Sequence, residues 1–436
     1  MSRIRFVFSL LLVVALLSIP TAALAQDKVE VEMWLLDDEL GQCVLEVVTE
    51  GFNSTSQTAQ IKVVLQPNVD DAVRTALAAG SGPDIVPAGG PAFIQEYAKA
   101  DLLHPLNDYA AQFGWDELFV PWALELGKID DTLYSLPDSL ETMVIWYNKT
   151  LFEEQGWQVP KTMDELFTLA QTIDDAGIIP FGNAFGDFPP AHEWFVMVFL
   201  NNYAGADKVY EALTGQRAWT DPAFVEAITK LNEMVQNGWV DGSTDLFFTD
   251  SFDTVGAMVG AGEAAMTLDG SWADMSTYFG PEAGNENDFD WFAIPTSSGE
   301  ESYVTGIGAS WGINANSRHP EAAAEFLTWM FSPAAQNERF NRCGYALAPV
   351  HISAEALTQA DPRTARIYTS YAEAASAGRY GYTTYTFWPP DTEVYLYEEI
   401  QRVYLGELTP EEYMQGMQEH FAKELAEGAV PPIPPR

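Results

Sequence analysis

The stretch VEVEMWLLDDELGQCVLEVVTEGF, residues 29–52, sets the pattern for the first part of the chain. Residues 29–36 have the composition of a β-strand, and residues 40–52 have that of a helix. Further strands are predicted at 61–66 and, after Ser81-Gly82-Pro83, at 84–87. Because strands and helices alternate, we expect an α/β fold with a parallel sheet.

Capping residues predict where several later helices start. Thr162 with Glu165 has the spacing of a capping box, Asp221 precedes Pro222, and Thr409-Pro410 is followed by Glu412. After Pro320, apolar residues recur with helical spacing, which predicts a helix that packs one face on a sheet; they are Ala323, Phe326, Leu327 and Met330.

The N-terminal segment is typical of a secretory signal peptide. Arg3 and Arg5 precede an apolar stretch over residues 6–19, which ends at Pro20 before Ala23-Leu24-Ala25. We expect residues 1–25 to be removed and the protein to be exported, to a periplasm or outside the cell. With no cysteine at the cleavage point, no lipid anchor is expected there. The remaining length suggests two or three domains.

The net charge and the composition exclude several classes of binding partner. The chain has 21 basic and 63 acidic residues, a formal net charge of −42, which would repel nucleic acid and anionic lipid. Five scattered histidines and two distant cysteines give no metal-ligand spacing, so neither a metal nor another cofactor is expected. Cys43 and Cys343 are either a disulfide or two small buried apolar residues, and the sequence leaves this open.

An apolar run over residues 264–268 ends at Asp269-Gly270-Ser271-Trp272. A carboxylate beside an aromatic ring suits a sugar, since the ring can pack on the C–H face of a pyranose while the carboxylate accepts from hydroxyls. Gly270 lets the backbone turn sharply between them. The alternative is a surface turn whose Trp folds back on its own domain.

Several separated stretches resemble the extracellular solute-binding proteins of sugar-importing ABC transporters, of the maltose type. They are GPDIV (82–86), LLHPLNDY (102–109), LYSLPDSLETMVIWYNKTLFEEQGWQVPKTMDEL (133–166), AAMTLDGSW (264–272), FAIP (292–295), VTGIGASWGINANSRHPEAAAEFLTWM (304–330) and the final helices after Trp388. Their order and spacing match that family over nearly the whole mature chain.

The resemblance implies a two-lobed α/β fold with three chain crossings and a ligand cleft between the lobes. Lobe I would comprise residues 26–139 and 309–343, and lobe II residues 142–303 and 349–436. The crossings are expected near 139–142, 304–308 and 343–348. The implied function is to capture a mono- or oligosaccharide by hinge closure and deliver it to an ABC permease in the membrane, as a monomer without catalysis. Both cysteines would lie in or near the first lobe.

The resemblance also implies which residues face the ligand. From the first lobe and the first crossing they are Trp34, Asp37, Asp38, Gly89, Gly90 and Glu141. From the second lobe and the second crossing they are Asp187, Phe188, Asp269, Gly270, Trp272, Gly306, Gly308, Tyr385 and Trp388. Alternative roles are a helix cap for Asp37 and Asp38, a partner within the hinge for Glu141, backbone bending for Gly306 and Gly308, and core packing for Trp34 and Trp388.

Two enzyme classes are alternatives to this interpretation. Gly308-Ala309-Ser310-Trp311-Gly312 matches the nucleophile elbow of a serine hydrolase, with His319, His351 or His420 as a base, but the segment is predicted to continue as a strand instead of turning into a helix. A glycoside hydrolase would use paired carboxylates among Glu141, Asp187 and Asp269. The resemblance leaves no part of the chain for a separate catalytic domain.

Overall fold

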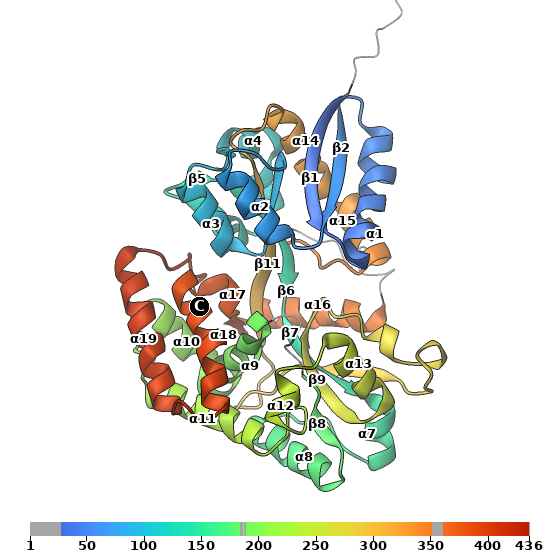
Figure 1. The fold of residues 1–436 in the computed structure, drawn as a ribbon, viewed down its shortest axis with the longest axis vertical. Coiled ribbons are helices and arrows are strands. Elements are labelled where there is room, and N and C mark those ends of the chain that lie inside the picture. Colours follow the sequence, from blue (N-terminus) through green and yellow to red (C-terminus); the bar gives the residue numbers. More distant parts are fainter. Residues whose placement is uncertain (1–27, 184–185, 187–188, 351–360, 436) are drawn as a thin grey trace, which may run out of the picture.

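The computed structural model describes residues 28–183, 186, 189–350 and 361–435. Its helices and strands form two lobes, one above the other in Figure 1. The expected signal peptide, together with Asp187 and Phe188, lies outside the described residues.

The first lobe is built on a six-stranded sheet with the order β12-β11-β3-β1-β2 and with β6 also paired to β11, and the sheet extends along β11 into the second lobe, where β12 lies. The strands are β1 (Val29–Leu36), β2 (Ala59–Gln66), β3 (Ile85–Ala88), β6 (Ser135–Glu141), β11 (Tyr303–Ile313) and β12 (Tyr380–Tyr382). As predicted, β1 is parallel to both β2 and β3. The sheet is nonetheless mixed, because β11 runs antiparallel to β3 and β6.

Helices cover this sheet (Figure 1). They are α1 (Glu39–Val48), α2 (Val69–Ala78), α3 (Pro91–Lys99), α4 (Asn107–Phe113), α5 (Trp115–Leu118), α6 (Pro121–Glu125), α14 (Pro320–Met330) and α15 (Pro333–Cys343), with a π-helical turn η1 (Thr49–Asn53) and a small hairpin of β4 (Lys128–Ile129) and β5 (Thr132–Leu133). The predicted apolar face of α14 is fully buried in the same core as the inward side chains of β1.

The second lobe contains a four-stranded sheet with the order β10-β7-β9-β8. Its strands are β7 (Met143–Asn148), β8 (Ile179–Phe181), β9 (Ala264–Gly270) and β10 (Phe289–Phe292). Its helices are α7 (Lys149–Gln155), α8 (Met163–Asp175), α9 (Glu193–Val198), α10 (Ala206–Leu213), α11 (Pro222–Gln236), α12 (Thr244–Phe247), α13 (Phe252–Ala261), α16 (Pro362–Ser376), α17 (Thr384–Phe387), α18 (Pro390–Tyr404) and α19 (Pro410–Glu427), with short turns η2 (Pro189–His192), η3 (Phe199–Gly205), η4 (Met275–Tyr278) and η5 (Pro281–Ala283).

The helix starts predicted from capping residues are confirmed, with one difference in a capping contact. Thr409 and Glu412 form a complete capping box at the start of α19, and Asp221 caps α11. Thr162 caps α8, but the Glu165 side chain accepts from the N–H of Lys161 instead of that of Thr162. These ends satisfy N–H groups that have no partner inside their own helix.

Two strands run from one lobe into the other. In β11, Val304 and Ile307 belong to the core of the second lobe, whereas Trp311 and Ile313 belong to the core of the first. The antiparallel partner β6 is followed, after Thr142 alone, by β7 of the second sheet. The segment after α15 joins them, since the N–H of Leu140 donates to the carbonyl of Leu347 at 2.7 Å. Figure 1 shows β6 and β11 side by side between the lobes.

The structure shows that the two cysteines are bonded to each other. Cys43 of α1 and Cys343 of α15 form a disulfide, with their Cα atoms 5.7 Å apart. Beside it, Arg342 pairs with Glu46 and Glu50 of the first helix and the turn that follows. Segments 300 residues apart in sequence are therefore tied together within the first lobe.

The hydrolase motif is not a nucleophile elbow. Residues 308–312 continue as part of β11, as predicted, and Ser310 is only 2% exposed, paired with Ala88 on one side and Pro137 on the other. A nucleophilic serine needs an exposed side chain at a sharp turn between a strand and a helix, and this position has neither.

Candidate functional site

Glu141 ends β6 where the chain leaves the first lobe. Its carboxyl lies over Gly308 of β11, where a Cβ atom would come within 1.8 Å of Glu141 Oε1. The hydroxyl of Ser139 donates to the same oxygen at 2.5 Å. Burial raises the pKa of Glu141 to about 7, with the hydroxyls of Ser139 and Tyr385 acting in the opposite direction. A side chain at position 308 would therefore displace this carboxyl.

Tyr385 lies beside this carboxyl, and Gly90 lies beside the backbone carbonyls of Ile307 and Tyr385. The hydroxyl of Tyr385, on α17, lies close to Glu141 but without normal hydrogen-bond geometry. Gly90 has a positive φ of 104°, which favours glycine, and a Cβ there would lie 3.5 Å from the carbonyl oxygen of Tyr385. The two lobes and the two crossing strands thus meet at Gly90, Glu141, Gly308 and Tyr385, which we term the Glu141 cluster.

Trp272 lies next to the first crossing. The N–H of Ser271 donates to the carbonyl of Thr142 at 2.8 Å, which places Trp272 beside the residue that follows Glu141. The half-buried indole folds over Gly270, where a Cβ atom would lie 2.2 Å from the ring. It packs edge-to-face on Trp194 of α9, with ring centroids 5.5 Å apart, so one side of the ring folds back on its own lobe, as in the alternative role. Gly270 is needed for this close approach, whereas its backbone is that of the last residue of β9 and has no positive φ that would require glycine.

Asp269 lies apart from Trp272. Successive side chains of a strand point to opposite faces, and the ring of Trp272 occupies the face of Gly270, so the carboxyl of Asp269 lies on the other face. In the sheet Asp269 is opposite Val144, which belongs to the core cluster that Tyr278 packs against. Burial raises the pKa of Asp269 to about 7, although the N–H of Gly270 donates to it at 2.6 Å.

Two predicted ligand contacts take up their alternative roles. Trp388 is fully buried in the second lobe and packs on Trp219, with ring centroids 5.3 Å apart, so it presents no ring face to a ligand. Asp38 caps α1, accepting from the N–H of Gly41 at 2.7 Å. The prediction that Trp388 contacts the ligand is therefore wrong, because its ring is packed in the core. For Asp38 the ligand contact stays a prediction, since only Oδ1 of its carboxylate caps the helix.

The other predicted positions have the following surroundings, and Gly306 is opposite Glu141 in the ladder of β11 and β6. Trp34 is half-buried and donates to Glu32 at 2.7 Å, and Asp37 is exposed at the end of β1. Gly89 is exposed and its N–H faces the carboxyl of Asp70. Gly306 leaves room for α17, because a Cβ there would lie 2.2 Å from the hydroxyl of Thr383.

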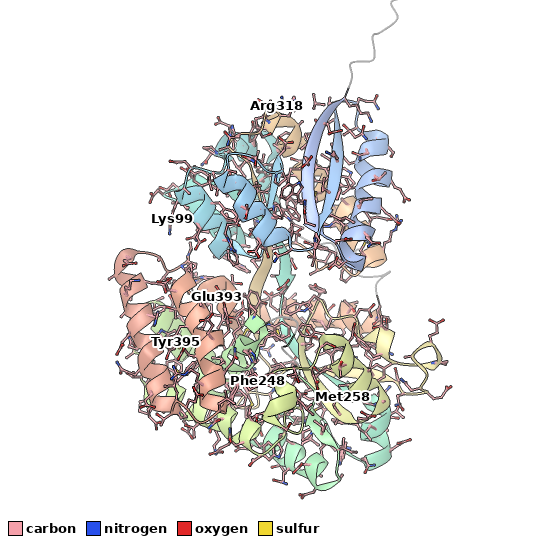
Figure 2. All side chains as sticks on the ribbon, viewed as in Figure 1. Lys99, Phe248, Met258, Arg318, Glu393 and Tyr395 are labelled. Carbon is pink, nitrogen blue, oxygen red and sulfur yellow. A yellow bond between two sulfur atoms is a disulfide. The ribbon has the colours of Figure 1, made fainter. Side chains whose placement is uncertain are left out.

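Sequence reasoning missed two carboxylates behind Tyr385. Glu193, the first residue of α9, is 2% exposed, and one of its oxygens has no hydrogen-bond partner among the described residues. Burial, and then the charge of Glu393, raise the pKa of Glu193. Figure 2 places Glu393 at the end of α18 that faces the first lobe. The signal available in the sequence was a charged residue directly before the apolar run WFVMV.

Asp241 makes the stability of the second lobe depend on pH. It is fully buried, and burial raises its pKa to about 8 despite a 2.6 Å hydrogen bond from the N–H of Asn183. Between its normal pKa and this value the folded state binds more protons than the unfolded chain, so the free energy of unfolding falls as pH rises. Glu141 and Asp269 add to this trend.

We therefore expect Asp241→Asn to raise the free energy of unfolding at pH 8.5 by about 1–3 kcal/mol and to have little effect at pH 5. Asparagine also tolerates the positive φ of 51° at this position. Urea denaturation at both pH values measures the effect, with the exposed Asp116→Asn as a control. An equal gain at both pH values would show that Asp241 is ionised throughout.

Two cavities open elsewhere on the second lobe. One, of about 360 Å³, lies between α19 and the residues that follow α10, and the other, of about 430 Å³, lies along α7. Neither is lined by a residue of the Glu141 cluster. In the described part of the chain, no helix has the length and apolar character needed to cross a membrane.

Comparison with known proteins gives concordant results. The sequence pattern of the bacterial extracellular solute-binding proteins matches residues 44–337. An ABC transporter extracellular-binding protein of Pyrococcus horikoshii is 27% identical over 62% of this chain and 59% of its own length. The multiple sugar-binding protein of Streptococcus mutans is 22% identical over 79% of this chain and 81% of its own.

Among solved structures, a chitin oligosaccharide binding protein superimposes with a TM-score of 0.75 at 23% identity, covering 92% of this chain and all of that one. This likeness establishes the two-lobed α/β fold.

Proposed function

We propose, on the premise that this chain belongs to the bacterial extracellular solute-binding proteins, that it captures a mono- or oligosaccharide between its lobes and delivers it to the permease of an ABC importer. The Pyrococcus relative is matched over 59% of its length, so the ligand is argued from this chain's own residues. Related proteins named for binding multiple sugars and chitin oligosaccharides support a saccharide.

The observation that carries the proposal is the position of Trp272 beside the Glu141 cluster. A half-buried indole lies next to the first crossing, while a carboxyl and a phenol hydroxyl lie at the cluster. A pyranose needs both an aromatic face for its C–H groups and polar groups that exchange hydrogen bonds with its hydroxyls. At a pKa of about 7, Glu141 is able to donate as well as accept near neutral pH.

The crossing strands favour closure by a hinge. Few segments join the lobes, and they lie side by side, so a small change in backbone angles there would rotate one lobe against the other. We place the crossings near 139–142, 304–308 and 343–348, with lobe I at 26–139 and 309–343 and lobe II at 142–303 and 349–436. Closure would bury the saccharide and present a new surface to the permease.

We propose a binding role without catalysis. The family and its structural neighbours are binding proteins. We further propose that the protein is exported, without a lipid anchor at the signal peptide, and acts as a monomer without nucleic acid.

A thermal-shift screen tests this function. Maltotriose, chitobiose, raffinose, xylotriose, monosaccharides, polyols and amino acids are each added to the protein, and bound samples are analysed for cleavage products. A ligand that binds the folded state alone raises the melting temperature. We expect a shift with one saccharide class and no cleavage. Shifts with amino acids alone would contradict the proposal, and cleavage products would favour the hydrolase.

Trp272→Ala is expected to weaken saccharide binding by about 1–3 kcal/mol, because a buried aromatic contact is lost. Calorimetry of the saccharide found in the screen measures this loss. Trp157→Ala is the matched control, since Trp157 is also a half-buried ring of the second lobe but lines the cavity along α7. Equal affinities for the Trp272 variant and wild type, with both folded, would remove Trp272 from the site.

A further inference from the structure

Ser139 has an unusual backbone conformation. Its φ of +57° lies in the left-handed region, which side chains other than glycine, asparagine and aspartate rarely adopt. It is nearly buried, at 7% exposure, and lies within β6, two residues before Glu141. Strained residues of this kind persist only when their surroundings hold them, and they gather at functional sites.

The neighbouring Asp138 holds Ser139 in this conformation. Its Oδ1 accepts from the N–H of Ser139 at 3.0 Å. Its Oδ2 accepts from Trp311 of β11 at 2.8 Å and from Arg339 of α15 at 2.6 Å. Both Asp138 and Arg339 are almost fully buried, and the guanidinium lies 4.0 Å from the ring centroid of Tyr345. The crossing strand is therefore clamped to the first lobe directly before Ser139.

The side chain of Ser139 points at the candidate site. Its hydroxyl donates to Glu141 Oε1 at 2.5 Å, and Gly308 leaves the space that this arrangement requires. In an extended strand, residues 139 and 141 would also share a face, but the left-handed turn changes the direction of the chain between them. The contact is thus made with Ser139 in the left-handed conformation that Asp138 holds.

We propose that Ser139 is a positioning residue for the saccharide: its hydroxyl, aimed by the clamped left-handed turn, holds the Glu141 carboxyl in the orientation that accepts a ligand hydroxyl. The inference rests on the proposed function for the identity of the ligand. The hydrogen bond from Ser139 to Glu141 does not depend on the proposed function.

The hydroxyl also favours the charged form of Glu141. Burial raises the pKa of this carboxyl to about 7, while the hydrogen bond from Ser139 lowers it. The other titratable groups facing Glu141 are Asp138 on the same strand, Tyr385 on α17, Tyr345 after α15 and Tyr368 on α16. Without the Ser139 hydroxyl, the pKa of Glu141 would be higher.

Ser139→Gly tests the proposal without imposing strain, because glycine accepts the positive φ. The titration of Glu141 is followed by ¹³C NMR of protein labelled at glutamate carboxyl carbons, with its signal identified by its loss in Glu141→Gln. We expect the midpoint to rise by about one pH unit in Ser139→Gly, as for a lost hydrogen bond to a charged group. The matched control is Ser135→Ala, a buried serine of the same strand whose hydroxyl has no partner in the described structure.

An unchanged Glu141 midpoint in folded Ser139→Gly would overturn the proposal, as would an equal shift in Ser135→Ala. The second readout is the affinity for the saccharide found in the screen, measured from pH 5 to 9. We expect affinity about tenfold weaker at pH 7 in Ser139→Gly, partly recovered towards pH 9 as Glu141 ionises. If no saccharide binds wild-type protein, the proposed function fails, whereas the titration still decides the contact.

Discussion

Arg339→Leu is expected to destabilise the protein by about 3–5 kcal/mol, the largest effect we foresee for a single substitution. The side chains of Arg339 and Asp138 are 2% and 0% exposed, and they are 2.6 Å apart. Removing the guanidinium leaves a buried carboxylate whose remaining donors include the indole of Trp311 and the N–H of Ser139. Denaturant unfolding at pH 7, with the midpoint and slope compared with wild type, measures the loss.

Arg342→Leu provides the comparison. Arg342 is on the same helix and pairs with Glu46 and Glu50, but all three side chains are substantially exposed. Exposed pairs contribute about 0–1 kcal/mol, so this variant should unfold near wild type. The double variant Asp138→Asn/Arg339→Leu should lose less stability than Arg339→Leu alone, because no buried charge remains. Equal losses in the two single variants would show that burial of the Arg339 pair is unimportant.

Cys43→Ser/Cys343→Ser is expected to lower the free energy of unfolding by about 2–5 kcal/mol. The disulfide joins residues 300 apart in sequence, so in the unfolded chain it restrains a long loop. Thermal unfolding of the double variant and of reduced wild type should agree. Under denaturing, non-reducing conditions, thiol titration of the wild type should detect no free thiol. A melting temperature insensitive to reductant would contradict this prediction.

Local signals predicted most of the fold correctly. The strand at residues 29–36 and the caps at Asp221 and Thr409 each rest on side chains close in sequence. Such signals are legible because propensity, capping and periodicity act over a few residues. The parallel order of the first strands followed from alternation, but the antiparallel insertion of β11 could not, since it joins residues more than 200 apart.

The candidate site was only partly predictable. Glu141, Gly308, Tyr385 and Gly90 were named from family resemblance, and the structure brings these four together. Trp388 was wrongly predicted to contact the ligand. A tryptophan near a loop has the same sequence pattern whether its ring packs on Trp219 or is exposed to solvent. Glu193 was overlooked because its environment is created by α17 and α18, far away along the chain.

The amino-acid order alone was enough to specify the alternation of strands and helices, their ends and the acidic, exported character expected of the chain, because these depend on neighbouring side chains and total composition. The contact of Ser139 with Glu141, the opposite faces taken by Asp269 and Trp272, the disulfide and the buried Asp138–Arg339 pair arise only in the folded molecule. Each depends on distances and burial between segments far apart in sequence, which no local pattern encodes.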